Sequence, residues 1–205
     1  MKYIFWDFNG TILDDVELCH NLLNQLLVEE GGKEVTRKRY LDIFTFPVKK
    51  YYIKAGLDVN NTPFDVLAHR FMDRYQSASL KEKLYPSVIE TINRFKENGY
   101  KNICLSASKY DNLVEQLKYF EIFDLFDDVL GTKDIYAKTK LDVAIKYVKE
   151  NNIDPKDMLM IGDTLHDAHI AKKLGASVIL NANGHQSRKR LKNYTLVDDY
   201  NKIDI

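Results

Sequence analysis

The sequence is poor in several features that mark specialised classes of protein. Only two of its 205 residues are cysteines, Cys19 and Cys104, and both lie in apolar stretches. This argues against a disulfide scaffold or a thiolate zinc site, so we expect a reducing, cytoplasmic location. The hydrophobic runs are too short to span a membrane, and the N-terminus lacks the layout of a signal peptide. We therefore expect neither a secreted nor a membrane protein.

The chain also has no excess of charge of either sign. Thirty basic and thirty acidic residues give a formal net charge of zero. Binding to nucleic acid or to an anionic membrane by electrostatics alone is therefore not expected. With 205 residues, 45% of them hydrophobic, the chain suits one domain with a sizeable core, or one core with an inserted subdomain.

Short apolar runs separated by helical patterns predict an α/β fold. Runs of this length and composition are typical of strands that are buried on both faces of a parallel sheet. Between them, apolar residues recur at helical spacing, as at Val88, Ile92 and Phe95. The expected strands occupy residues 2–8, 102–106, 128–131, 158–163, 177–180 and, more weakly, 195–197. This alternation favours a doubly wound parallel sheet with right-handed crossovers.

The segment 14–83 interrupts the alternation of strands and helices. It has apolar stripes at helical spacing and no convincing strand, and one stripe runs from Val16 to Leu27 before a Gly-Gly pair. A helical insert after the first strand explains this break. We therefore predict an α/β core over residues 1–13 and 84–205 and an all-helical cap over residues 14–83.

Polar side chains follow three of the predicted strands at their carboxyl ends, where ligands bind in open α/β sheets. Asp7 could be a nucleophile or a metal ligand, or simply a residue of the Asn-Gly turn that follows. Asp163 and Asp167 could share one hard cation, or could cap the helix after them. Ser106 is suited to hold a phosphate together with the free N–H groups of a helix N-terminus.

The order and positions of these motifs resemble those of the haloacid dehalogenase (HAD) superfamily, in its phosphoglycolate-phosphatase-like branch. The resemblance rests on Asp7-Phe8-Asn9-Gly10-Thr11, on Ser106, on a lysine near residue 138 and on the segment from Gly162 to Asp167. It covers essentially the whole chain, including the helical insert. It implies a HAD-like, Rossmannoid core with a cap. It also implies a magnesium-dependent phosphohydrolase that acts on a small phosphorylated metabolite through an aspartyl phosphate.

The resemblance also implies roles for individual residues. Asp7 matches the nucleophile, and Lys138 matches the catalytic lysine better than Lys140 does by its distance to Gly162-Asp163. The expected ligands of Mg²⁺ are Asp7, the backbone carbonyl of Asn9, Asp163 and, as a supporting acid, Asp167. The residues expected to bind the substrate are Thr11, Ser106, Ala107 and Lys138.

Position 9 departs from the family pattern. The family's aspartate there protonates the leaving group and then activates water, whereas this chain has Asn9. An amide cannot exchange a proton near neutral pH, and general acid–base help typically contributes about 100- to 10,000-fold to the rate. We therefore expect slower turnover or a restricted set of substrates, in which acidic leaving groups such as acyl and aryl groups are favoured over alkyl groups.

Two alternative functions stay open. A phosphonate hydrolase of the same superfamily would need a cap lysine that forms an imine, and Lys49, Lys50 and Lys54 are available. A binding protein that has lost turnover would keep the metal and phosphate groups. The favoured reading is the phosphatase. For it we expect a small-molecule phosphate substrate and no nucleic-acid or membrane partner, while the sequence indicates no oligomeric state.

The remaining aromatic and histidine residues give no motif of their own. The five histidines have no spacing typical of metal ligands, although His166 could reach the site. An aromatic cluster in the insert is most simply part of its core, but some of it could line the substrate pocket, because the resemblance implies a cap that sets specificity. Its members are Tyr40, Phe44, Phe46, Tyr51 and Tyr52.

Overall fold

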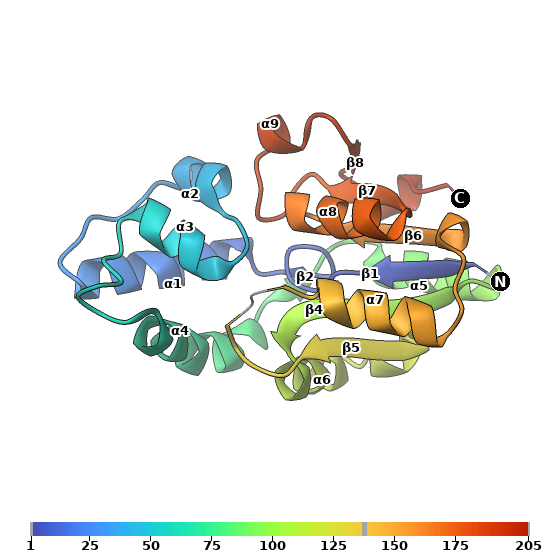
Figure 1. Ribbon diagram of the computed structural model, residues 1–205, viewed down its shortest axis with the longest axis horizontal. Coiled ribbons are helices and arrows are strands. Elements are labelled where there is room, and N and C mark those ends of the chain that lie inside the picture. The colour runs from blue at the N-terminus through green and yellow to red at the C-terminus, as the bar shows by residue number, and fades with distance from the viewer. Residues whose placement is uncertain (1, 137–138, 205) are drawn as a thin grey trace.

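The computed structural model describes residues 2–136 and 139–204, which form an α/β core with a helical unit at one end of its sheet (Figure 1). Within these residues the main sheet has six parallel strands in the order β5-β4-β1-β6-β7-β8. Their bounds are Tyr3–Trp6 (β1), Lys101–Lys109 (β4), Asp128–Thr132 (β5), Met158–Gly162 (β6), Ser177–Asn181 (β7) and Thr195–Val197 (β8). The strand order runs outward in both directions from β1. The predicted doubly wound parallel sheet is confirmed.

Helices cover both faces of this sheet because the strands are apolar on both sides. Ile4 and Trp6 of β1 pack in one buried cluster with residues of α5 and α6, whereas Phe5 packs on the opposite face with residues of α7 and α8. The helices of the core are α5 (Val88–Glu97), α6 (Tyr110–Tyr119), α7 (Leu141–Glu150), α8 (Leu165–Leu174) and α9 (Arg188–Leu191). Short 3₁₀ turns occupy Phe123–Leu125, Pro155–Asp157 and Tyr200–Lys202.

The helical unit between β1 and β4 has a hydrophobic core of its own. Its buried cluster is drawn entirely from residues between Val16 and Tyr75 and includes Leu23, Leu26 and Tyr40. The helices are α1 (Val16–Glu29), α2 (Arg37–Ile43), α3 (Val48–Ala55) and α4 (Phe64–Ser79). A separate core is what an inserted domain requires. The boundaries 14 and 83 that we predicted for a cap stay a prediction.

The two chain crossings between the helical unit and the core lie side by side. β2 (Leu13–Asp14) and β3 (Lys83–Leu84) pair as an antiparallel ladder that is separate from the main sheet. The sequence analysis missed this ladder, because strands of two residues leave no periodic pattern. Within the described residues, no helix combines the length and the apolar character that a membrane span requires.

Candidate active site

The carboxyl ends of the central strands bring together side chains that are far apart in the sequence. Asp7 directly follows β1, Asp163 directly follows β6, and Ser106 lies in β4 on the other side of β1. All three side chains are at least nine-tenths buried. They lie at the point where the strand order reverses, which is where open α/β sheets bind their ligands.

Lys140 connects these elements from the N-terminus of α7. Its ammonium lies 2.5 Å from Oδ1 of Asp7 and 2.8 Å from Oδ1 of Asp167, and it donates to the carbonyl oxygen of Leu105 at 2.9 Å. Only 1% of the lysine side chain is exposed. Burial acts to lower the pKa of Lys140, but the carboxylates of Asp167 and Asp7 outweigh it and hold the pKa above its ordinary value. Lys140 is therefore a fixed positive charge beside Asp7.

Asp7 and Asp167, which contact this ammonium, form a cluster of three carboxylates with Asp163. Asp7, Asp163 and Asp167 each offer an oxygen within 4.8 Å of the others, which is the arrangement that a shared cation needs. Oδ1 of Asp163 is buried and has no hydrogen-bond partner among the described residues. A buried oxygen without a partner is costly unless a ligand satisfies it. The donor set therefore fits a hard divalent cation such as Mg²⁺.

The same crowding changes the acidity of the carboxyl groups. Burial is the main cause that raises the pKa of Asp7 to about 7, although Lys140 opposes it. Burial likewise raises the pKa of Asp163 well above its ordinary value. For Asp167 burial is outweighed by Lys140, which lowers its pKa. A divalent cation would act against the raised pKa values of Asp7 and Asp163, because a nearby positive charge favours the ionised carboxylate.

Asp167 serves two purposes that the sequence analysis had treated as alternatives. Its Oδ2 accepts hydrogen bonds from the backbone N–H and the hydroxyl of Thr164, at 3.0 and 2.7 Å, as part of a capping box at the start of α8. Its Oδ1 faces Lys140. The helix cap therefore holds the second oxygen in the acidic cluster.

Two glycines leave room for the carboxylates. Gly10 has a φ of +70°, and a Cβ there would lie 2.4 Å from Oδ2 of Asp163. A Cβ at Gly162 would lie 2.3 Å from Cγ of Asp167. Side chains at these positions would displace the acidic cluster.

Asn9 is held by hydrogen bonds on both sides of its amide. Its Nδ2 donates to Oδ2 of Asp15 at 3.0 Å and to the hydroxyl of Tyr75 at 2.5 Å. Its Oδ1 accepts from the hydroxyl of Ser108 at 2.9 Å and from that of Ser106 at 3.5 Å. A carboxylate at position 9 would face the Asp15 carboxylate across the same gap. The amide of Asn9 can donate a hydrogen bond to the Asp15 carboxylate, whereas a second carboxylate at position 9 would repel it.

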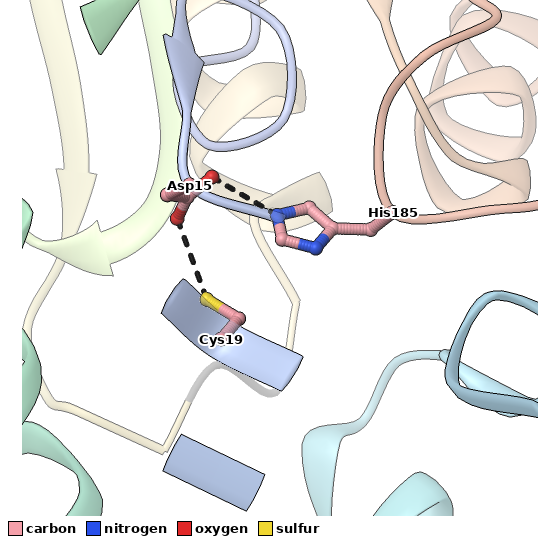
Figure 2. A group of neighbouring side chains, drawn as sticks. All are labelled: Asp15, Cys19 and His185. Atoms are coloured by element: carbon pink, nitrogen blue, oxygen red, sulfur yellow. Dashed lines mark hydrogen bonds and ion pairs between the residues drawn. The ribbon is translucent and has the colours of Figure 1, made fainter. Parts of the chain in front are cut away.

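Asp15 is also the centre of a buried network that joins the core to the helical unit (Figure 2). Its Oδ1 lies 3.1 Å from Nε2 of His185, and its Oδ2 accepts from the thiol of Cys19 at 3.5 Å. The other ring nitrogen of His185 lies 2.7 Å from the hydroxyl of Tyr40. Asp15, Cys19 and His185 are close enough to share a metal ion. Hydrogen bonds already satisfy the two side-chain oxygens of Asp15, so the cluster is a structural link in this arrangement.

Asp15 and His185 each shift the pKa of the other toward its charged form. Burial lowers the pKa of His185, but Asp15 outweighs it and raises the value to about 8. Burial raises the pKa of Asp15, and here His185 outweighs it and lowers the value. His185 is therefore largely cationic and Asp15 ionised at neutral pH.

The structure brings most of the predicted site residues to one cavity. Asp7, Asn9, Ser106 and Ala107 line it, and Asp163 and Asp167 lie buried beside Asp7. Thr11 is fully buried and is not among the residues lining the cavity. Lys138 falls outside the described residues. Lys140, which ranked second in the sequence analysis, makes the contacts to Asp7 and Asp167.

Several residues at this cavity were missed in the sequence analysis. Ser108 lies in β4, two residues beyond Ser106, and its hydroxyl donates to Oδ1 of Asn9. Asp15 and His185 are separated by 170 residues and meet only in the fold. His185 follows β7, one strand beyond β6, so its position after a strand end was the available signal. His166, which we had considered as a site residue, stacks on Phe46 with ring centroids 4.8 Å apart.

Comparison with known families identifies the class. A model of the haloacid dehalogenase-like hydrolases matches residues 4–181, so the chain belongs to this family of hydrolases. It is 26% identical to a phosphoglycolate phosphatase of Nitrosospira multiformis over 87% of this chain and 82% of that protein. It is 28% identical to a phosphoglycolate phosphatase of Vibrio vulnificus over 86% of this chain and 82% of that protein. The predicted superfamily, its phosphoglycolate-phosphatase-like branch and an enzyme of the phosphatase type are confirmed.

Solved structures agree on the fold. A haloacid dehalogenase-like hydrolase from Streptococcus pneumoniae superposes with a TM-score of 0.85, at 19% identity, over 98% of this chain and 96% of that one. CbbY from Rhodobacter sphaeroides, solved as a mutant with xylulose-1,5-bisphosphate, gives a TM-score of 0.78 at 18% identity, over 98% of this chain and 96% of that one.

The His185–Asp15 pair predicts a pH-dependent contribution to stability. Because folding raises the pKa of His185 from 6.5 to about 8, the pair stabilises the fold fully below pH 6.5 and loses this contribution as the pH rises through 8. A shift of this size corresponds to about 2 kcal/mol. Urea unfolding of the metal-free wild type and of His185→Asn, from pH 6 to pH 9, measures it. We expect the difference between the two proteins to shrink by about this amount, whereas a constant difference would contradict the pairing.

Proposed function

We propose that the protein is a magnesium-dependent phosphatase that hydrolyses a small phosphorylated metabolite through an aspartyl phosphate on Asp7. One observation carries the proposal. The buried carboxylate of Asp7 contacts the ammonium of Lys140 and lies beside an acidic pair, Asp163 and Asp167, with which it fits a divalent cation. A nucleophile, a fixed positive charge and a cation site at one strand end are the groups that phosphoryl transfer requires.

The residues divide the reaction between them. The hydroxyl of Ser106 binds a phosphoryl oxygen, the nearby charge of Lys140 offsets the negative charge of the phosphoryl group, and an oxygen of Asp7 attacks phosphorus. As the new O–P bond forms, the bond to the leaving-group oxygen breaks and that oxygen takes the electron pair. Water then attacks phosphorus and releases phosphate from Asp7. When bound by Asp7, Asp163 and the carbonyl of Asn9, with Asp167 in support, Mg²⁺ would offset the negative charge of the phosphoryl group.

We assign the role of the catalytic lysine to Lys140. Its contacts to Asp7 and Asp167 support this assignment, as does its burial. The sequence-based preference for Lys138 rested on distance along the chain alone. The relatives named phosphoglycolate phosphatase support a small phosphate ester as the substrate. The two free, buried cysteines agree with the proposed cytoplasmic location.

The geometry disfavours the phosphonate alternative. An imine-forming lysine must face the reacting carbon beside Asp7, but Lys49, Lys50 and Lys54 are exposed and none of them lines the cavity. Loss of turnover is the alternative that Asn9 keeps open, and a direct assay separates it from the phosphatase.

Replacing the nucleophile tests the proposal. Asp7→Asn should reduce hydrolysis of p-nitrophenyl phosphate by at least about 1,000-fold, because the covalent step needs the carboxylate. The wild type should be active with Mg²⁺ and inactive after chelation. Asp157→Asn, an exposed carboxylate in the 3₁₀ turn before β6, is the matched control and should keep wild-type activity. A fully active Asp7→Asn variant would refute the assignment, and an inactive wild type would favour the binding protein.

Exchanging the groups at positions 9 and 15 tests why Asn9 is present. In Asn9→Asp alone, two carboxylates would meet where Nδ2 of Asn9 now lies 3.0 Å from Asp15, so little gain in rate is expected. The double variant Asn9→Asp/Asp15→Asn restores a carboxylate with an amide partner. We expect it to raise kcat/KM for alkyl phosphates by about 10-fold or more, and for aryl phosphates by less, because general acid help matters most for poor leaving groups.

Fresh protein is needed for this comparison, because the Asn9-Gly10 sequence is prone to deamidation, and mass spectrometry of the peptide that contains Asn9 is the control. The interpretation fails if Asn9→Asp alone accelerates alkyl phosphates as much as the double variant does.

A further inference from the structure

The cavity beside Asp7 has two walls of different chemistry. Its volume is about 120 Å³, and Asp7, Asn9 and Ser106 form part of the polar wall on the core side. The opposite wall comes from the helical unit and is aromatic or apolar. Its members include Phe44, Phe46, Phe64, Phe71, Met72 and Tyr75. The leaving group of a substrate bound at Asp7 would face this second wall.

Among the described residues, no charged side chain of the helical unit between residues 19 and 75 lines the cavity. The charged groups that do line it are already paired. Asp7 contacts Lys140 and Asp15 binds His185, and both pairs are buried, whereas the ammonium of Lys109, 2.9 Å from Asp111, belongs to an exposed pair on the core side. The described part of the helical unit from residue 19 to 75 thus offers no cation to a carboxylate or a second phosphate on the leaving group, and burying such an anion without a counter-charge is costly.

The size of the cavity agrees with an aromatic ring. Packed protein interiors leave few voids larger than a water molecule, so a space of about 120 Å³ beside a nucleophile is room for a ligand. An apolar cavity of about 150 Å³ holds benzene, so the smaller space here admits one ring at most and no larger group. Rings already line the space, since Phe71 and Tyr75 stack at 5.7 Å and Phe44 stacks on His185 at 4.6 Å. Such walls favour an inserted aromatic group by offset or edge contacts.

Asn9 supports the same conclusion independently of the size of the cavity. Asn9 lines the cavity together with Asp7 and Ser106, and its amide cannot give up a proton near neutral pH, so the leaving oxygen departs without a proton from this side chain. A phenolate departs far more readily than an alkyl alkoxide does, because its conjugate acid, the phenol, has a pKa near 10.

We propose that the leaving group is aromatic, so that the substrate is an aryl phosphate whose ring occupies the apolar wall. This inference rests on the proposed phosphatase function and narrows its substrate. In the first step the Asp7 oxygen–phosphorus bond forms and the aryl oxygen–phosphorus bond breaks. The phenolate keeps the electron pair and takes a proton from solvent, and water then releases phosphate from Asp7.

Three substrates separate ring recognition from leaving-group acidity. Phenyl phosphate has the ring, acetyl phosphate has an acidic leaving group without a ring, and phosphoglycolate has a carboxylate on an alkyl leaving group. We expect kcat/KM for phenyl phosphate to exceed the other two by at least about 10-fold. Equal or faster hydrolysis of acetyl phosphate or phosphoglycolate would overturn the inference while leaving the phosphatase function intact.

Binding decides the question if no substrate is turned over, a result that would refute the phosphatase function alone. Calorimetry of the Asp7→Asn variant with Mg²⁺ compares phenyl phosphate with phosphoglycolate. At least about 10-fold tighter binding of phenyl phosphate is expected, and equal or weaker binding would overturn the inference.

A lysine in the apolar wall should change the preference. Met72→Lys places a cation in the cavity and should lower the ratio of kcat/KM for phenyl phosphate to that for phosphoglycolate by at least about 10-fold. Val66→Lys, on the same helix but 39% exposed and outside the cavity, is the matched control and should leave the ratio unchanged. An unchanged ratio in Met72→Lys contradicts the assigned wall.

If Met72→Lys does not fold, Met72→Ala tests the same wall by enlarging the cavity. It enlarges the cavity and should raise hydrolysis of naphthyl phosphate relative to phenyl phosphate. A ratio that does not rise would again place the leaving group elsewhere.

Discussion

The contact of Lys140 with Asp7 and Asp167 is the interaction on which the candidate site depends. It joins the end of β1, the start of α7 and the first turn of α8, and a third bond reaches the carbonyl of Leu105 in β4. One buried ammonium cannot balance the carboxylates of Asp7, Asp163 and Asp167. Burial raises the pKa of Asp7, and the excess of carboxylates over this one ammonium is what a divalent cation could balance.

A second constraint links the chemistry to the helical unit. Asn9 donates to both Asp15 and Tyr75, and Asp15 in turn binds His185, whose ring also contacts Tyr40. Asn9, at the position where the resemblance implies a proton donor, is therefore tied to α4 and, through the network, to α2. The amide at position 9 and Tyr75, a member of the aromatic wall, are joined directly by a hydrogen bond. Both features favour a leaving group that departs without help and is itself apolar.

The sequence predicted the fold more completely than the site. Short apolar runs marked the six described strands of the main sheet, because strands buried on both faces must be apolar throughout. Asp7, Asp163 and Asp167 were identified because strand ends converge at one edge. Asp15 and His185 could not be paired, since their contact depends on how a loop after β7 meets the helical unit. Likewise, distance along the chain could not show that Lys140 reaches Asp7, because that contact depends on the burial and direction of its side chain.

The central claim is that Asp7 carries the phosphoryl group during turnover. The most direct measurement is mass spectrometry of peptides from protein quenched in acid during hydrolysis of phenyl phosphate with Mg²⁺. Because Asn9 lacks a base to activate water, the account predicts that a phosphoryl group accumulates on the peptide that contains Asp7. Steady turnover of substrate with this peptide unmodified at all quench times, or with the phosphoryl group on another residue, would contradict it.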